Sequence, residues 1–305
     1  MRIIHGLIHI LVLLSMPPLL LGVIAKTKAV FAGRAGPSLW QPYYNIAKLM
    51  RKGVVISTAT TWVFQFGPVV TLAALLLAGL LVPFGRFDAP IGFTGDLILF
   101  VYLFGLARFF TAAAALDTGS PFEGMGAARE LTFACLAEPA LLFTFLVLAK
   151  VSGSLDLNVM LHGPLAGLWR LSVAPMVLVA AGFFVIILAE NCRIPVDDPD
   201  THLELAMIHE VMALDHSGPL LGVILYEASV KLFVLSSVIL HIVIPYHTSW
   251  VWLDWGMFIG QMLGLAIVIG VVESIMARLQ MRHVLTLLVA ASLLCGFGFL
   301  LLIRA

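Results

Sequence analysis

Long runs of apolar residues, separated by short polar segments, dominate the pattern along the chain. A helix needs about 20 mostly apolar residues to cross the hydrocarbon core of a bilayer, and backbone inside lipid must satisfy its own hydrogen bonds. Eight runs meet this length: 3–25, 61–83, 92–115, 129–151, 171–192, 219–244, 251–276 and 283–303. The pattern therefore predicts an all-α polytopic membrane protein, with residues 1–305 forming a single membrane domain.

The first run, 3–25, has the apolar character of a secretory signal but lacks its cleavage pattern. No small-residue cleavage motif follows the run, and seven further runs come after it. We therefore expect it to be the first transmembrane helix.

A basic loop, 26–52, separates the first two runs and contains a different periodicity. Over 38–51, apolar residues recur at helical spacing at Leu39, Tyr43, Ile46 and Met50, and basic residues gather at the end at Lys48, Arg51 and Lys52. This pattern predicts a short amphipathic helix in the membrane interface. It is compatible with lipid anchoring and with lining a substrate path.

Lysine and arginine are unevenly distributed between the two sides that eight spans define. Ten lie beside one set of loops: Lys26, Lys28, Arg34, Lys48, Arg51, Lys52, Arg129, Arg193, Arg278 and Arg282. Five lie beside the termini and the other loops: Arg2, Arg86, Lys150, Arg170 and Arg304. Because cytoplasmic loops are enriched in basic residues, the pattern predicts that both termini face outward.

Acidic residues are concentrated in one stretch, 190–218, of a chain that is 61% hydrophobic and 11% charged. The stretch holds seven of the seventeen: Glu190, Asp197, Asp198, Asp200, Glu204, Glu210 and Asp215. The formal net charge of zero gives no preference for nucleic acid as a partner, and the sequence has no Gly-rich phosphate loop. The positive-inside pattern places this acidic stretch in the cytoplasm.

Within the acidic stretch, the sequence predicts a non-helical start and then a helix. Pro195 and Pro199 disfavour a helix before Asp200, which can cap one. Apolar residues follow at helical spacing at Leu203, Met207, Val211 and Leu214. Carboxylates close together raise one another's pKa, so this group suits a proton relay. A solvated cytoplasmic loop explains the same pattern.

The spacing of the histidines and cysteines does not match a metal site. His209-Glu210 begins the H-E-x-x-H zinc pattern, but residue 213 is alanine where the second histidine is needed. The three cysteines, Cys135, Cys192 and Cys295, lack the spacing of a cluster or a structural zinc site. The sequence therefore predicts no metal, no cofactor and no catalytic residue in this chain.

Charged residues inside the predicted spans are costly and usually face a partner or a wet cavity. They are Arg108, Glu130, Glu138, Glu227, Lys231 and Glu273. Glu130 and Glu138 share one helical face, which favours an ion path over a structural anchor. Glu227 and Lys231 are spaced to form an ion pair, and Glu273, shortly before Arg278, marks the end of a helix.

Several motifs resemble those of one membrane-protein family. They are Arg34-Ala35-Gly36-Pro37 with Trp40-Gln41 and Lys48-Leu49, the 190–197 stretch that ends in Ile194-Pro195-Val196-Asp197, Asp215-His216-Ser217-Gly218, and the 116–122 stretch followed by 128–132 and Glu138-Pro139. Over nearly the whole chain the sequence resembles the proximal membrane subunit shared by respiratory complex I and energy-converting NiFe hydrogenases. The 116–122 stretch is similar to the hydrogenase and formate hydrogenlyase branch rather than to complex I itself.

The resemblance implies a non-catalytic subunit of a bacterial or archaeal cytoplasmic (inner) membrane. Its cytoplasmic side would anchor a hydrogenase-type large subunit and iron–sulfur subunits, which would carry the NiFe centre and the clusters. A proton path toward antiporter-like membrane subunits would use Arg108, Glu130, Glu138, Glu190, Asp197, Asp200, Glu204, Glu210, Asp215, Glu227, Lys231 and Glu273. The redox arm or a quinone-like cavity would border Arg34, Gly36, Pro37, Trp40, Arg193 and His202.

Departures from the family motifs bear on these roles. Ala35 replaces an arginine and Val196 a phenylalanine, which weakens the case for quinone more than the case for a proton path. His202, with His209 and His216, is expected to titrate near neutrality. Two alternatives stay open: a complex I-like, quinone-reducing NADH dehydrogenase subunit, and a stand-alone ion transporter, which the lack of a visible inverted repeat disfavours.

Overall fold

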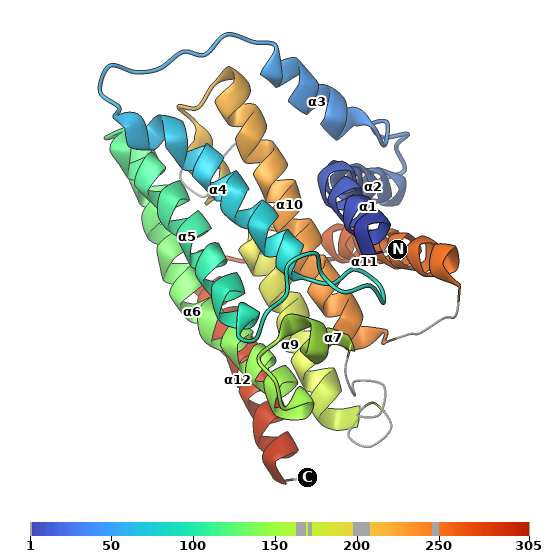
Figure 1. The fold of residues 1–305 in the computed structure, drawn as a ribbon. Coiled ribbons are helices and arrows are strands. Elements are labelled where there is room, and N and C mark those ends of the chain that lie inside the picture. The colour runs from blue at the N-terminus through green and yellow to red at the C-terminus, as the bar shows by residue number, and fades with distance from the viewer. Residues whose placement is uncertain (1, 163–168, 170–172, 198–207, 246–249, 305) are drawn as a thin grey trace.

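The computed structural model describes the chain except at residues 1, 163–168, 170–172, 198–207, 246–249 and 305. Figure 1 shows its elements in chain order: α1 (Arg2–Ser15), α2 (Pro17–Phe31), α3 (Gln41–Met50), α4 (Trp62–Leu81), α5 (Asp96–Asp117), α6 (Pro121–Ser152), α7 (Leu157–His162), α9 (Val173–Glu190), the 3-10 helix η1 (Glu210–Ala213), α10 (Gly218–Val243), α11 (Val251–Ile275) and α12 (Met281–Arg304). The predicted all-α fold is confirmed.

Membrane spans occur where the apolar runs predict them. Seven of the described helices are long and apolar enough to cross a bilayer: α4, α5, α6, α9, α10, α11 and α12. The pair α1 and α2 meets the same criterion together, although it is bent by 45° at its break. With this pair counted as one span, the described part of the chain has the eight spans that were predicted.

The first span is not the single helix expected for 3–25. The helix breaks at Met16, because Pro17 and Pro18 have no N–H groups to continue it. Beyond the break, α2 continues to Phe31. Lys28, which was assigned to the basic loop, therefore lies on this helix.

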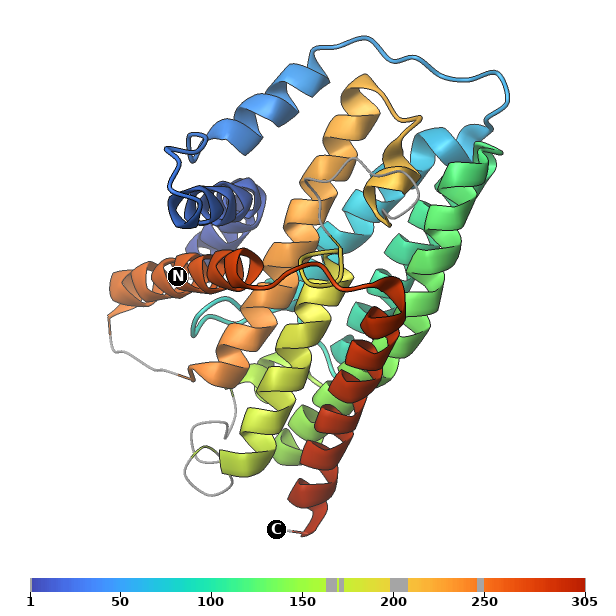
Figure 2. The ribbon, with the colours of Figure 1, turned by 180° about the vertical axis from the view of Figure 1, so that it is seen from behind.

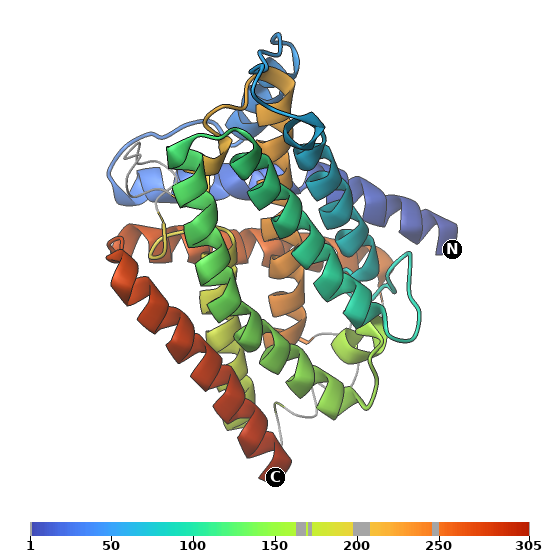
Figure 3. The ribbon, with the colours of Figure 1, turned by 90° about the vertical axis from the view of Figure 1, so that its left-hand side faces the viewer.

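The helices form two groups that cross each other. α4, α5, α6, α9, α10 and α12 run along the length of the bundle, whereas α1, α2 and α11 cross it steeply (Figure 2). The view from the side shows the same crossing (Figure 3). α10 packs against helices of both groups and is the most buried of the candidate spans. It is therefore the central helix of the fold.

Small residues allow the helices to approach closely, as is usual in membrane proteins. A Cβ added to Gly79 on α4 would lie 3.2 Å from Val234 of α10. One added to Gly182 on α9 would overlap the Cys295 sulfur and lie 3.0 Å from the Ala291 carbonyl oxygen, both on α12. At these positions glycine determines the distance between the helix axes.

Polar contacts join the loops at the end of the bundle that carries the acidic stretch. The Asp117 carboxylate accepts hydrogen bonds from the N–H (2.6 Å) and hydroxyl (2.8 Å) of Thr61, the N-cap residue of α4. The Ser217 hydroxyl accepts one from the Val55 N–H at 2.9 Å. Beside it, Gly218 (φ +55°) packs against the Gly53 backbone. Asp117 belongs to the 116–122 stretch, and Ser217 and Gly218 belong to the Asp215-His216-Ser217-Gly218 motif. These two family-like motifs thus fix the segments that lead into α4 and α10.

The amphipathic helix predicted over 38–51 is confirmed as α3. None of its residues is buried. It lies along the first turns of α10, where a Cβ on Gly222 would approach Leu49 and Met50 to 3.3 Å. The Tyr43 hydroxyl donates a hydrogen bond to the Ser15 carbonyl. The placement of α3 in a membrane interface stays a prediction.

Gly182→Ala is expected to destabilise the fold by about 1–3 kcal/mol, because the added methyl group overpacks the contact between α9 and α12. Gly105→Ala is the matched control, since Gly105 is also inside a helix but has nothing within 4 Å of its Cβ position. Thermal unfolding of the purified protein in detergent measures both. Equal stability of the two variants would contradict the packing argument.

Candidate functional site

Arg108 on α5 is the centre of a charge network that joins four helices. Its guanidinium donates hydrogen bonds to Glu138 Oε1 on α6 and, at 2.6 Å, to Glu190 Oε1 on α9. The other carboxylate oxygen of Glu190 lies 2.9 Å from Lys231 Nζ on α10. The Glu190 side chain is 3% exposed, so it lies in a setting where an unpaired charge is strongly disfavoured. Pairing therefore joins the end of α9 to the interiors of α5, α6 and α10.

The ion pair of Lys231 differs from the predicted one. Glu227, one turn earlier on α10, was the expected partner, but Lys231 pairs with Glu190. Glu190 is the last residue of α9, and its carboxylate faces both Arg108 and Lys231. Arg108 orients this carboxylate through one oxygen, and Lys231 pairs with the other. Glu227 is 3% exposed, and its Oε2 has no hydrogen-bond partner among the described residues.

Glu130 and Glu227 complete the cluster around a small cavity of about 40 Å³, large enough for water. Arg108 and Lys231 line the same cavity. The Cys192 thiol lies 3.7 Å from Glu130 Oε2. We call Arg108, Glu130, Glu138, Glu190, Glu227 and Lys231 the buried charge cluster. It holds four carboxylates and two cations, so it can hold a proton without leaving a cation unpaired.

A second network fixes the start of the acidic stretch. Glu273 on α11 lies 3.3 Å from Lys28 Nζ and 3.4 Å from the Arg193 guanidinium. Asp197 pairs with Arg278 at 2.8 Å. Glu273 and Arg278 are close in sequence but have different partners. Together these contacts tie α2, α11 and the acidic stretch to one another.

The end of α9 turns into the acidic stretch through a Schellman motif. Cys192 is left-handed (φ 47°), and the N–H groups of Cys192 and Arg193 bond to the carbonyls of Ala189 and Leu188 at 3.1 and 2.8 Å. This turn places Cys192 against Glu130. The backbone turn at the end of α9 therefore brings the Cys192 thiol beside a carboxylate of the buried charge cluster.

A larger cavity, the chamber, has a volume of about 430 Å³ and lies between α2, α10 and the described segments 191–197 and 209–216. Its volume is within the range of small-molecule sites. Its apolar lining includes Leu21, Leu221, Ile224, Leu225 and Ala228. Its polar lining comprises Asn191, Arg193, Asp197, His209, Glu210 and His216.

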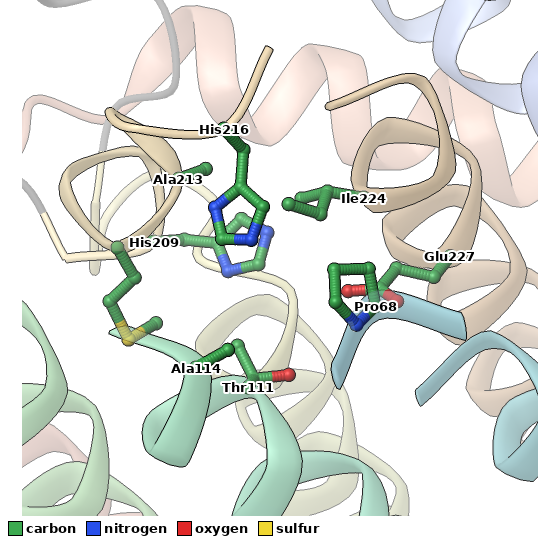
Figure 4. A pocket seen from close by; sticks show the side chains of 9 residues that line it. Pro68, Thr111, Ala114, His209, Ala213, His216, Ile224 and Glu227 are labelled. Atoms are coloured by element: carbon green, nitrogen blue, oxygen red, sulfur yellow. The ribbon is translucent and has the colours of Figure 1, made fainter. Parts of the chain in front are cut away.

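His209 and His216 lie between the chamber and the cluster. Figure 4 shows both rings directed into a narrow pocket of about 10 Å³, with Thr111 and Glu227 on its other walls. Desolvation by burial lowers the pKa of His209 to about 4 and also lowers the pKa of His216, whose ring stacks on Phe64. The expectation of titration near neutrality is wrong for His209, because burial disfavours the charged imidazolium. For His216, burial shifts the pKa in the same direction.

The structure divides the predicted proton-path residues into groups. Six form the buried charge cluster. Asp197 and Glu210 line the chamber, and Glu273 pairs with Arg193, which also lines it. Asp215 is exposed. Asp200 and Glu204 lie outside the described residues, as does His202. The helix predicted from Asp200 is, where described, only the 3-10 turn Glu210–Ala213.

The residues predicted to border a redox arm or quinone-like cavity are separated. Arg34, Gly36, Pro37 and Trp40 are exposed between α2 and α3, and none of these four lines the chamber. Gly36 has a φ of +66°, which favours glycine. Arg193 alone of the described members of this group lines the chamber.

Sequence reasoning missed several residues that hold this region. Lys28 and Arg278 were counted only as loop charges, yet they pair with buried carboxylates. Glu123 is fully buried and accepts a hydrogen bond from the Asp215 N–H at 3.0 Å. An acid in the first turn of a helix is ordinarily explained by the helix dipole, so its position alone could not reveal this contact.

Comparisons with known proteins place these features in a family. Residues 4–304 match the family described as NADH dehydrogenase. The chain is 34% identical to "Hydrogenase-4 component C" of Escherichia coli (strain K12), covering 80% of this chain and 76% of that protein. It is 31% identical to "Formate hydrogenlyase subunit 4" of the same organism, covering 92% of each. It is 28% identical to a subunit of the NADH-quinone oxidoreductase of Rubrobacter xylanophilus, over 56% of this chain and 53% of that one.

A solved structure shares the fold. It is titled "Structure of the membrane-bound sulfane sulfur reductase (MBS), an archaeal respiratory membrane complex". Its matching chain superposes with a TM-score of 0.83, covering 98% of this chain and 99% of that chain, at 18% identity. At that identity the likeness concerns the fold.

Acidification is expected to destabilise the protein in part through His209. The folded state holds this imidazole at a pKa of about 4, against 6.5 in the unfolded chain, so its protonation favours unfolding and stability falls as the pH drops from 6.5 to 4. In His209→Gln, the loss of thermal stability over this range should be smaller than in the wild type. His283→Gln, at an exposed position on α12, should behave like the wild type. An equal loss in His209→Gln would contradict the burial argument.

Proposed function

The chain belongs to the NADH dehydrogenase family, and from that premise we propose that it is the membrane subunit of an energy-converting hydrogenase or formate hydrogenlyase-type complex. In this role it anchors a peripheral redox arm and carries protons into the membrane domain. It performs no redox chemistry itself. The NiFe centre and iron–sulfur clusters belong to its partners.

The buried charge cluster is the observation that carries this proposal. A structural ion pair requires one anion for each cation, whereas Arg108 and Lys231 have four carboxylates around them. Ionisable groups inside a membrane domain are expensive and commonly mark ion pathways. The cluster also lies beside an acid-lined chamber. Protons can thus be exchanged between a loop region and the interior of the bundle.

Glu138 supports a membrane partner on the α5–α6 side. Its side chain pairs with Arg108 but remains 55% exposed near the middle of α6. A carboxylate facing lipid hydrocarbon is strongly disfavoured. An adjoining membrane subunit that offers polar groups or water would cover it. Antiporter-like subunits, which themselves carry ions, fit this requirement.

The loop end of the bundle supports the anchoring role. Arg34 and Trp40 are exposed beside the amphipathic α3, whose last turn carries Lys48. Aromatic and arginine side chains are favoured at protein interfaces. The positive-inside pattern assigns this end to the cytoplasm and both termini to the outer side. A redox arm docked there would stand directly above the chamber.

The chamber itself favours a second candidate function. A mostly apolar cavity of about 430 Å³ with a few polar groups suits a quinone head group. A complex I-like subunit that borders a quinone site would use Asp197, Arg193 and His209 on its wall. The separation of Arg34 from the chamber and the presence of Val196 make this the weaker candidate.

Purification of the tagged chain in mild detergent tests whether it belongs to a hydrogenase-type or to a complex I-like complex. The proposal predicts co-purification of a subunit with paired Cys-x-x-Cys motifs and of iron–sulfur subunits, with nickel in the preparation. Bound quinone together with NADH-oxidising subunits would favour the second candidate instead. Ion transport by the chain alone in proteoliposomes would contradict both and identify a stand-alone transporter.

Glu138→Gln is expected to leave assembly intact and reduce proton translocation by at least about tenfold, because the amide cannot exchange a proton with Arg108's network. Proteoliposomes containing the complete complex report this through a pH-sensitive dye during turnover. Asp88→Asn, at a 72% exposed side chain on the opposite end, is the matched control and should translocate like the wild type. Wild-type translocation in Glu138→Gln would remove Glu138 from the path.

A further inference from the structure

His209 occupies a position that no other described residue shares. It lines the chamber of about 430 Å³, the narrow pocket of about 10 Å³ and the cluster cavity of about 40 Å³. Glu227 and Thr111 line the last two but not the chamber, and His216 lines the first two but not the cluster cavity. The chamber and the cluster cavity share two lining residues, His209 and Ala228, and of these two only His209 has a side chain that can carry a proton.

The narrow pocket limits how a proton can pass. Its volume of about 10 Å³ is at the lower limit for one water molecule. The walls are largely apolar, with Pro68, Ala114 and Met212 among them. A continuous file of water needs more room and more polar partners than this pocket offers. A side chain must therefore carry the proton across it.

Imidazole is suited to this step. A neutral ring accepts a proton on its bare nitrogen and releases the one held on its other nitrogen. In each passage the ring binds one proton and releases one, and nothing is oxidised or reduced. The ring then returns to its starting tautomer before the next proton arrives. Burial keeps the ring neutral at rest, with a pKa of about 4. His209 thus transmits a proton rather than storing it.

Glu227 supplies the receiving group on the cluster side. It shares both smaller cavities with His209, and its Oε2 has no hydrogen-bond partner among the described residues. Figure 4 shows its carboxylate and the His209 ring at the same pocket. From Glu227 the cluster cavity leads to Glu130 and Lys231.

We propose that His209 is the proton relay between the chamber and the buried charge cluster, with Glu227 as its partner on the cluster side. The inference rests on the proposed proton-carrying function. It assigns a specific role to a residue that the sequence presented as part of an incomplete zinc motif and as one of three titratable histidines.

The test uses the complete complex in proteoliposomes, with proton translocation measured per electron transferred. His209→Gln and His209→Asn keep a hydrogen-bonding amide but cannot carry a proton, so each should lower this ratio by at least about tenfold. His216→Gln removes the neighbouring histidine that does not reach the cluster cavity and should keep more than half of the wild-type ratio. Either assembled His209 variant translocating at more than half the wild-type ratio would overturn the proposal.

A second measurement uses the unmodified complex and does not depend on how the variants fold. Histidine hydrogen–deuterium exchange, read by mass spectrometry, should detect exchange at the His209 ring, because water must reach it from the chamber. No exchange at His209, while exposed His283 exchanges, would overturn the relay. If the wild-type complex translocates no protons, the proposed function fails. If it does and Glu138→Gln abolishes translocation while the His209 variants do not, only the relay fails.

Discussion

The double ion pair of Arg108 is the constraint on which the membrane domain depends. A guanidinium between α5, α6 and α9 is tolerable only because Glu138 and Glu190 accept its hydrogen bonds. Glu190 in turn brings in Lys231 from the central helix α10. Removing Arg108 would leave the Glu138 carboxylate without its cation, and removing Glu190 would leave Lys231 without its ion-pair partner. The relative positions of four helices are therefore coupled to one electrostatic requirement.

The same principle organises the end of the bundle that carries the acidic stretch. Glu273 and Asp197 are buried carboxylates, and each is held by a cation from a distant segment. Backbone contacts add to this, since the Asp197 carboxylate also accepts the Ile208 N–H at 2.9 Å. The acidic stretch is thus held at both ends of its undescribed part. Asp197 lines the chamber because these contacts place it there.

Between the two charged regions the structure becomes narrow and mostly apolar. His209 lines the chamber, the narrow pocket and the cavity that Glu130 and Lys231 also line. In the proposed relay, a constriction that holds one neutral imidazole would admit protons singly, whereas a wide aqueous connection would allow protons to leak. Gly126 on α6 contributes to this shape, since a Cβ there would approach the Met212 side chain to 3.1 Å. Close packing of α6 against Met212 therefore shapes one wall of the narrow pocket.

Hydrophobic patterning alone determined the membrane spans and the amphipathic α3, because the thickness of the bilayer and the helical period act on local sequence. The same reasoning could find charged residues inside spans, since any charge there is exceptional. It failed at Met16, where Pro17 breaks a continuous apolar run, because hydropathy does not register the missing N–H group.

Which charges meet was decided only by the tertiary structure. Sequence spacing paired Lys231 with Glu227, yet Glu190, on a different helix, lies in reach and is oriented by Arg108. The neutral state of His209 likewise depends on burial by segments far away in sequence. Pairing and desolvation are properties of three-dimensional distance, which a linear pattern does not contain. The sequence by itself determined that this chain spans a membrane and carries acids there, and the fold decided which of these acids pair with a cation and which lie together in one cluster.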